Sequence, residues 1–364
     1  MLLRGIVFLA AIGGVVPPAQ DDLVIRTTTR LVEVRVVAEG DHGVPVADLS
    51  RSDFQILDNN VPQTIRLFAA YRSASAAAAV PSTGTEETPA WSPTPSGYAV
   101  ILLDWMNTGY ALRVMVQDAV LKLLKNYEPR QRVAIFVLSR DNPRLLCDFT
   151  YDRELLAELV RRLSLDPEDT DHGGDVAATL SHPLAPASES GRGGGRSGGN
   201  TAAREMAILE ARHRTTQTAV TFEKVADHLQ HVPGRKTLLW VTTGIPMTID
   251  GIYYAPYLES ALGRLNRSDT AIYSVDAAGL DPFHQPSDSL FEFARRTGGV
   301  TLYNRNDLDE AMRIALEDMQ VSYTLGFYAG EDLKPGLHAI DVKVDRPRIR
   351  LRYRESYDPS AGVR

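Results

Sequence analysis

The sequence has 364 residues, enough for about two or three domains of ordinary size. Its hydrophobic fraction of 44% and charged fraction of 23% are close to the averages of soluble globular proteins. These values exclude a wholly disordered chain, a collagen and a polytopic membrane protein. The formal net charge is −7, and because nucleic-acid binders need a basic surface to displace phosphate counterions, we expect no nucleic-acid partner.

The first residues are typical of an export signal. Arg4 precedes an apolar run over 5–16, and Ala19 stands before a polar stretch. The run is shorter than the roughly 20 residues that a membrane-spanning helix needs. We therefore predict a signal peptide over 1–19 that is cleaved near Ala19, no stable membrane span, and a secreted or periplasmic mature protein. A single cysteine, Cys147, excludes an intrachain disulfide.

Residues 22–70 are predicted to form an N-terminal β region. The segment 30–38 alternates apolar and polar side chains, as a half-buried strand does. The segments 54–57 and 63–68 flank an Asp-Asn-Asn turn and resemble a hairpin. This region is too short to close a β-sandwich alone. Residues 71–97 are rich in Ser, Ala, Thr and Pro and are predicted to be a linker.

The pattern then changes to continuous apolar strands that alternate with amphipathic helices, which predicts an α/β domain over 98–318 with a doubly wound, mostly parallel sheet. Strands are expected at 98–104, 132–138, 237–243 and 270–275, with an edge strand at 145–149. Helices are expected at 112–124, 153–163, 201–229, 257–265, 289–296 and 308–319. The polar, Gly-rich segment 166–200 is predicted to be a flexible insertion.

Strand character returns over 319–358. We expect these C-terminal strands to pair with the N-terminal β region, so that the α/β domain is inserted into a smaller β-sandwich-like domain. Near the end of the chain, Arg348, Arg350, Arg352 and Arg354 alternate with apolar residues, which predicts four guanidinium groups on one strand face. Such a stripe suits either an anion-binding surface or a solvated sheet face protected by charge.

Polar residues follow two predicted strands at the sheet edge where ligands bind in open α/β folds. Asp104 ends the first strand, and Asn107 and Thr108 lie in the loop after it. Thr243 ends a later strand, directly after Thr242. Oxygen-bearing side chains of this kind suit a hard cation, although a lone aspartate in this place equally serves as a helix or turn cap.

Several short stretches in this order resemble a known family. They are Ile-Leu-Leu-Asp-Trp-Met-Asn-Thr over 101–108, Phe-Thr-Tyr-Asp over 149–152, Ile-Tyr-Ser-Val-Asp over 272–276 and Tyr-Thr-Leu-Gly-Phe-Tyr over 323–328. Together they resemble the von Willebrand factor A (VWA) domain, and more specifically the secreted acidobacterial proteins described as VWFA-related. The resemblance covers most of the mature sequence.

The resemblance implies an altered metal-ion-dependent adhesion site. In the family, Asp-x-Ser-x-Ser, a loop Thr and a second Asp bind the cation. Here Asp104 matches the first Asp, while Met106 and Thr108 replace the serines. Asn107 adds an oxygen one position away. Thr201 is the expected loop Thr, and Thr243 replaces the second Asp. The implied cofactor is Mg²⁺ or another divalent cation, held more weakly than in intact members.

Two functions follow from these patterns. The first is an exported, non-enzymatic interaction or adhesion module, in which a VWA-like domain with a degenerate metal site binds a protein ligand that presents a carboxylate. The alternative is a metal-assisted periplasmic hydrolase, in which Asp104 holds a cation and a nearby carboxylate such as Asp276 acts as base. The Gly-x-Ser-x-Gly and Gly-x-Gly-x-x-Gly spacings in this sequence fall within 191–199, which follows no predicted strand, and no phosphate-binding Gly-rich loop precedes Lys-Ser or Lys-Thr. This favours the first function.

Overall fold

The structure is a computed structural model, and it describes residues 30–41, 44–72, 92–93, 97–126, 131–140, 143–163, 197–281, 284–318, 321–330, 336 and 338–357. The predicted signal peptide, most of the predicted linker and most of the predicted Gly-rich insertion lie outside the described residues.

The α/β unit is built on a mixed sheet in the order β13-β12-β9-β6-β7-β8. The strands are β6 (Tyr98–Asp104), β7 (Arg132–Leu138), β8 (Pro143–Thr150), β9 (Lys236–Thr242), β12 (Thr270–Asp276) and β13 (Thr301–Leu302). All neighbours in this order pair in parallel except β7 and β8, which are antiparallel. The central strands are apolar throughout because helices cover both faces of the sheet.

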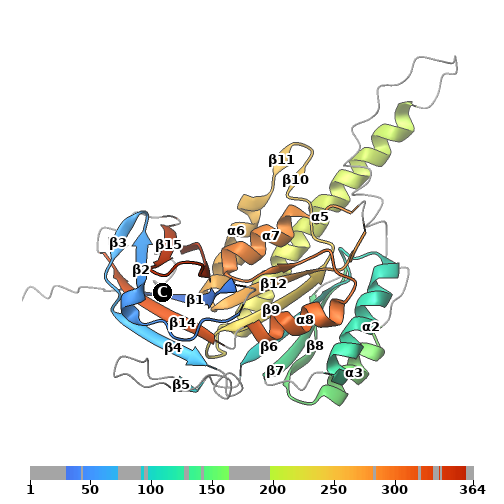
Figure 1. Ribbon diagram of the computed structural model, residues 1–364. Helices are drawn as coiled ribbons and strands as arrows, with labels where there is room; N and C mark the ends of the chain where they lie inside the picture. The colour runs from blue at the N-terminus through green and yellow to red at the C-terminus, as the bar shows by residue number, and fades with distance from the viewer. Residues whose placement is uncertain are drawn as a thin grey trace, which may run out of the picture.

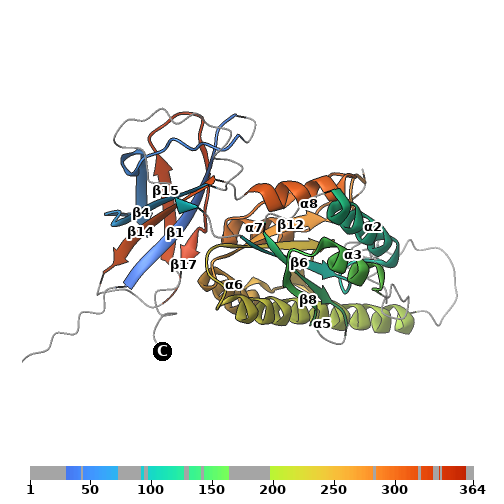
Figure 2. The ribbon, with the colours of Figure 1, turned by 90° about the horizontal axis from the view of Figure 1, so that it is seen from below.

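The helices of this unit are α2 (Tyr110–Asn126), α3 (Arg153–Arg161), α5 (Ser197–Leu229), α6 (Ala255–Arg267), α7 (Asp288–Thr297) and α8 (Leu308–Glu317). One hydrophobic cluster joins α2, α3 and α8 to the sheet, and a second joins α5, α6 and α7 to the opposite face. Figure 2 shows these two helical layers with the sheet between them. The unit therefore has the three layers that the sequence pattern predicts.

Three details differ from the sequence-based expectation. Helix α5 begins at Ser197, so the last residues of the segment expected to be a loop are helical. A small hairpin, β10 (Thr248–Ile249) and β11 (Ile252–Tyr253), follows β9 and was not expected. Strand β13 was not expected either. Each of these strands has two residues, which is too few to show an alternation of polar and apolar side chains.

The second unit consists of two sheets, in the orders β16-β1-β14-β4-β5 and β17-β15-β2-β3. Its elements are β1 (Arg30–Glu39), the short helix η2 (Arg51–Asp53), β2 (Phe54–Asp58), β3 (Val61–Gln63), β4 (Leu67–Arg72), β5 (Ser92–Pro93), β14 (Val321–Ala329), β15 (His338–Val344), β16 (Arg350–Arg352) and β17 (Ser356–Tyr357). The last two residues of β4 and the whole of β5 lie within the stretch 71–97 that was predicted to be a linker.

Strands from the two ends of the chain pair in this unit. β1 runs antiparallel to β14, and β2 runs antiparallel to β15. One hydrophobic cluster contains Val34 from β1, Ile56 from β2 and Val342 from β15, so the inner faces of the two sheets share a core. We call this part the β-sandwich unit. In Figure 1 it lies beside the α/β unit, with the blue N-terminal and red C-terminal strands together.

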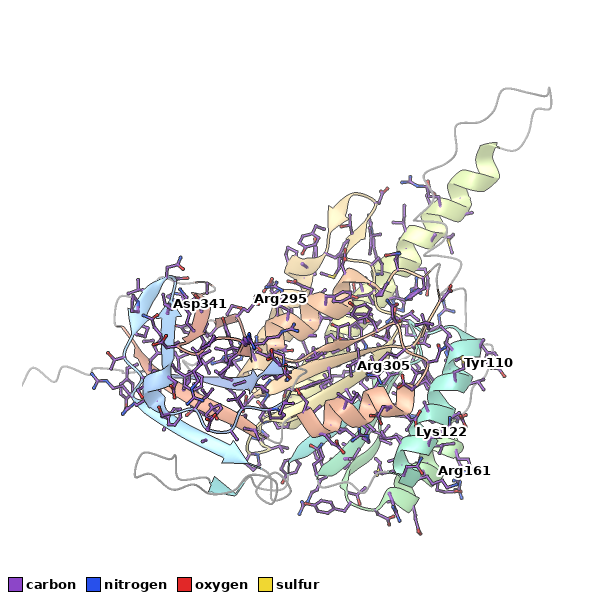
Figure 3. The ribbon with its side chains drawn as sticks, in the orientation of Figure 1. Tyr110, Lys122, Arg161, Arg295, Arg305 and Asp341 are labelled. Atoms are coloured by element: carbon purple, nitrogen blue, oxygen red, sulfur yellow. The ribbon has the colours of Figure 1, made fainter. Side chains whose placement is uncertain are left out.

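The β-sandwich unit packs against the amino-terminal edge of the α/β sheet. Arg35 of β1 lies 3.4 Å from the carboxylate of Asp269, the residue before β12. Arg295 near the end of α7 forms an ion pair with Glu355, and Figure 3 shows Arg295 on the side of α7 that faces the sandwich. The carboxyl ends of the parallel strands, where Asp104 lies, are therefore at the far side of the sheet from this junction.

The arginine stripe belongs to this junction, and neither sequence-based interpretation of it holds for all four residues. Arg352 is buried and contacts the carboxylates of Asp318 and Glu39. Arg354 donates from Nη1 to the main-chain oxygen of Asn266 at 3.3 Å. Arg348 has a left-handed φ of 61° and precedes the strand, and its side chain is 82% exposed. Arg352 and Arg354 therefore link the two units, whereas Arg348 and Arg350 are exposed.

Candidate functional site

The carboxyl edge of the α/β sheet contains a buried hydrogen-bond network centred on Asp104. The Asn107 main-chain nitrogen donates to Asp104 Oδ1 at 3.0 Å, and its side-chain Nδ2 donates to both carboxylate oxygens at 3.0 and 2.9 Å. Trp240 Nε1 donates to Oδ2 at 3.0 Å, and Thr242 Oγ1 donates to the same oxygen at 2.8 Å. Asp104 has no exposed surface.

Strand geometry explains why these side chains meet. Leu103 and Val241 face the α2 and α8 side of the sheet. Side chains alternate along a strand, so Asp104, Trp240 and Thr242 all face the α5 side. Helix α5 adds Thr218, whose hydroxyl accepts from Asn107 Nδ2 at 3.1 Å. The network therefore joins β6, β9 and α5.

The predicted metal ligands are only partly brought together. Asn107 contacts Asp104 directly, whereas Thr243 donates to the main-chain oxygen of Asn107 and Thr242 reaches the carboxylate instead. Thr108 is buried, and its hydroxyl has no hydrogen-bond partner among the described residues. Thr201 lies within the N-terminal part of α5, and its side chain lies outside the described residues. Thr201 was expected in a loop, but the structure places its backbone in a helix.

A cationic side chain stands near the network. Arg214 of α5 is 5% exposed, and its charge attracts the Asp104 carboxylate. Burial lowers the pKa of Arg214, an effect that Glu210 and Asp104 oppose. Burial raises the pKa of the Asp104 carboxyl above its ordinary value, although the hydrogen bonds from Asn107, Thr242 and Trp240 act in the opposite direction. The protein thus supplies both a cation and neutral donors to this carboxylate.

This arrangement does not fit a divalent cation at Asp104. A cation needs carboxylate lone pairs, but Asn107 Nδ2 faces both oxygens, and Trp240 and Thr242 donate to one of them. The side-chain oxygen of Asn107 and the hydroxyl of Thr108 are buried without a hydrogen-bond partner in the described part of the chain, so the site offers only neutral oxygens to a ligand. Across the described residues, no group of three or more His, Cys, Asp or Glu side chains is placed to hold a metal ion.

Sequence reasoning missed Trp240, Thr218 and Arg214 as parts of the site. Trp240 carries a readable signal, because it lies two residues before Thr242 and so shares its strand face. Thr218 and Arg214 carry no comparable signal. They lie 111 and 110 positions from Asn107 and Asp104 in the sequence, and only the packing of α5 brings them to the loop.

Asp276 ends β12 at the same edge of the sheet and forms a separate pair. Its carboxylate accepts from the Ala278 main-chain nitrogen at 3.0 Å and lies 3.0 Å from His284 Nε2. Strand β9 lies between β12 and β6, so Asp276 and Asp104 end different strands of the sheet. Each carboxylate thus has its own partners. A shared cation, as the hydrolase alternative requires, is not supported by these contacts.

The pH dependence of stability should report the buried state of Asp276. Burial raises the pKa of this carboxyl above its ordinary 3.8, so its contribution is fully present below that value and is lost as pH rises through the raised pKa. Asp276→Asn cannot ionise at this position. We expect the wild type to lose stability relative to Asp276→Asn as the pH rises above about 4, as measured by urea unfolding at a series of pH values. A difference in stability that is constant with pH would contradict this expectation.

Beyond the sheet edge, exposed apolar side chains lie on the hairpin β10–β11 and at the start of α6. Ile249 of the hairpin packs against Ala207, Ile208 and Ala211 of α5. The exposed residues Ile252, Tyr253 and Tyr257 belong to the hairpin and to α6 and are between 45% and 68% exposed. We call these three residues the hairpin surface. Figure 1 shows α5 extending past the sheet with the hairpin beside it.

No family model matches this sequence, and no curated protein matches it. Among solved structures, proximal thread matrix protein 1 of the mussel byssus aligns at 10% identity and a TM-score of 0.32, covering 62% of this chain and 48% of that one. This chain thus spans about half of the mussel protein.

BatB of Bacteroides thetaiotaomicron aligns at 12% identity and a TM-score of 0.33, covering 61% of this chain and 98% of that one. The VWA domain of SpRpn10 aligns at 13% identity and a TM-score of 0.30, covering 60% and 94%. VWA domains are therefore among the structural neighbours, but at these scores the α/β architecture rests on the strand order described above.

Proposed function

We propose that this protein is an exported, non-enzymatic interaction module with a VWA-like α/β unit, and that it binds a protein partner at the carboxyl edge of its sheet. The observation that carries the proposal is the hairpin surface. Exposed large apolar side chains that gather over two elements are typical of protein contact sites, because water contact with such a surface is unfavourable. Tyr253 and Tyr257 are also of the type that contributes most to binding.

Recognition in this proposal does not pass through a cation. The Asp104 carboxylate is buried and already accepts from Asn107, Trp240 and Thr242, so a partner carboxylate has no free coordination position to complete there. In the family that the sequence resembles, the corresponding site is a metal site; here we propose that it is degenerate and holds the loop 104–108 and α5 in place. The hairpin surface then depends on a rigid base.

Within the described residues, none of the helices is both long enough and apolar enough to cross a bilayer. Secretion or periplasmic residence is the part of the proposal that rests on the signal-like sequence over 1–19. The alternative hydrolase function has no supporting contact in the structure, because the two acids it requires are each satisfied by separate partners.

The proposal is tested by replacing two residues of the hairpin surface. The double variant Ile252→Gln/Tyr253→Gln should capture its partner from an envelope extract at least about tenfold more weakly than the wild type, because hot-spot aromatic and apolar contacts are lost. Both residues are exposed, so the melting temperature should be unchanged. Quantitative mass spectrometry of the captured protein provides the measurement.

The matched control is Tyr151→Gln/Leu155→Gln, since these residues are equally apolar and each 44% exposed, but they belong to the start of the α3 region. This control should capture the same protein as the wild type. Capture should also continue in chelator. A partner that both double variants retain, or that chelator releases from the wild type, would contradict the proposal.

A further inference from the structure

A polar cavity of about 260 Å³ lies at the junction of the two units. It is at the amino-terminal edge of the α/β sheet, whereas Asp104 lies at the carboxyl edge. Its walls come from β1 and β14 of the β-sandwich unit, from the end of α6 and the loop between α6 and β12, and from the segment after β16. The lining residues that matter for the argument are Arg35, Arg267, Asp269, Thr324 and Arg354.

The cavity carries buried hydrogen-bond donors that the protein itself does not use. Thr324 is 3% exposed, and its hydroxyl has no hydrogen-bond partner among the described residues. The Nε of Arg354 is buried and also lacks a partner in the described part of the chain. Leaving a buried polar group unsatisfied is unfavourable, so such groups point to a ligand.

The strand pattern explains why these groups face the cavity. Tyr323 and Leu325 point into the sandwich core, so Thr324 between them points outward, toward the α/β unit. Arg35 is its cross-strand partner on β1 and lies between the core residues Val34 and Val36. The two side chains therefore stand next to each other on the face that meets the α/β unit.

Positive charge exceeds negative charge around the cavity. The cationic side chains of the cavity wall and of the adjoining start of β9 are Arg35, Arg235, Lys236, Arg267 and Arg354, and the facing carboxylates are Glu33 and Asp269. Arg235 and Lys236 donate to main-chain oxygens, which carry no net charge. Burial lowers the pKa of both side chains, and the neighbouring charge of Arg35 acts in the same direction. An anion would relieve this excess.

We propose that this cavity binds a tetrahedral oxyanion, that is, a phosphate or sulfate group, and so links the two units. Thr324, Arg354 and Arg267 belong to different elements of the cavity wall, which suits an anion with oxygens in several directions better than a planar carboxylate. The charge excess suits a dianion. The cavity also has room for a small organic group attached to the anion.

The test is thermal unfolding of the full chain in sodium phosphate, sodium sulfate, sodium succinate and sodium chloride at equal ionic strength. A ligand that binds the native state raises its apparent stability by mass action, and we expect a rise of about 2–4 °C in phosphate or sulfate over chloride. Calorimetric titration of the wild type with phosphate measures the binding directly.

Two variants identify the cavity as the source of the rise. Thr324→Val removes a hydroxyl that has no partner among the described residues, and Arg267→Gln removes an exposed charge, so both variants should fold and lose most of the rise. The matched controls are Thr215→Val on α5, which removes another buried hydroxyl without a partner in the described part of the chain, and Arg153→Gln on the surface of α3. Both controls should keep the full rise in melting temperature in phosphate or sulfate.

Phosphate and sulfate also stabilise proteins generally through exclusion from the surface, and that effect is common to all variants. The proposal is overturned if no rise over chloride occurs, if Thr324→Val and Arg267→Gln keep the full rise, or if succinate alone produces it. A rise with either tetrahedral anion that both variants lose supports the assignment.

Discussion

Replacing Asp104 by alanine should lower the free energy of unfolding by about 3–5 kcal/mol, because the substitution leaves the Trp240 indole N–H and the Asn107 amide buried without an acceptor. The loss should be the same in Mg²⁺ and in chelator. Urea unfolding of both proteins, with Mg²⁺, Mn²⁺ or Ca²⁺ and with EDTA, measures this. Neither the cations nor EDTA should shift the wild type.

Asp118→Ala provides the control for a lost carboxylate. Asp118 lies on the exposed side of α2, and its side chain is 71% exposed, so its removal should change stability by no more than about 0.5 kcal/mol. If EDTA lowers the stability of the wild type to that of Asp104→Ala, the carboxylate is a metal ligand and the hydrogen-bond interpretation of the site is wrong.

Replacing Arg352 by methionine should also cost about 3–5 kcal/mol. The guanidinium contacts Asp318 at 2.5 and 2.7 Å and also contacts Glu39, and Tyr273 donates its hydroxyl to the same Asp318. The Asp318 and Glu39 side chains are 16% exposed, so removal of the cation leaves two poorly solvated carboxylates without a counter-ion. Urea unfolding provides the measurement.

Arg313→Met is the control that distinguishes the effect of burial on stability from the effect of the number of ion pairs lost. Arg313 also pairs with two carboxylates, those of Glu310 and Glu317, but its side chain is 39% exposed. Solvent screening reduces such pairs to about 1 kcal/mol or less. Equal losses for Arg352→Met and Arg313→Met would show that the junction network contributes no more than a surface pair.

Much of the α/β unit could be predicted from the sequence because its signals are local. The strand Tyr98–Asp104 is apolar from Ala99 to Leu103, which is what burial on both faces requires, and it is found with the predicted bounds. The hairpin β10–β11 could not be predicted, since it depends on the contact of Ile249 with α5 and not on its own pattern. The start of α5 was placed too late because the glycines near residue 198 favour a loop.

The candidate site shows the same division. Asp104, Asn107 and Thr108 are close in sequence and could be identified from the chain alone. The sequence does not show whether the side-chain oxygen or the side-chain nitrogen of Asn107 faces Asp104. This orientation determines whether Asn107 can be a metal ligand or is a hydrogen-bond donor to Asp104. Arg352 and Arg354 of the arginine stripe contact Asp318 and Asn266, which belong to the α/β unit, are distant in sequence and are not recognisable as partners from the chain alone. Tertiary packing determined these features.

The pairing of β1 with β14 sets an order of assembly during synthesis. Arg30 aligns with Ala329, so nearly the whole chain must leave the ribosome before β1 finds its neighbours. The α/β unit has its own strands and helices between these two segments and can fold first. Until then β1 is a strand with one apolar face and open edges, the kind of segment that pairs with other chains. The β-sandwich unit is therefore the part of the molecule that most needs protection from aggregation while the chain is incomplete.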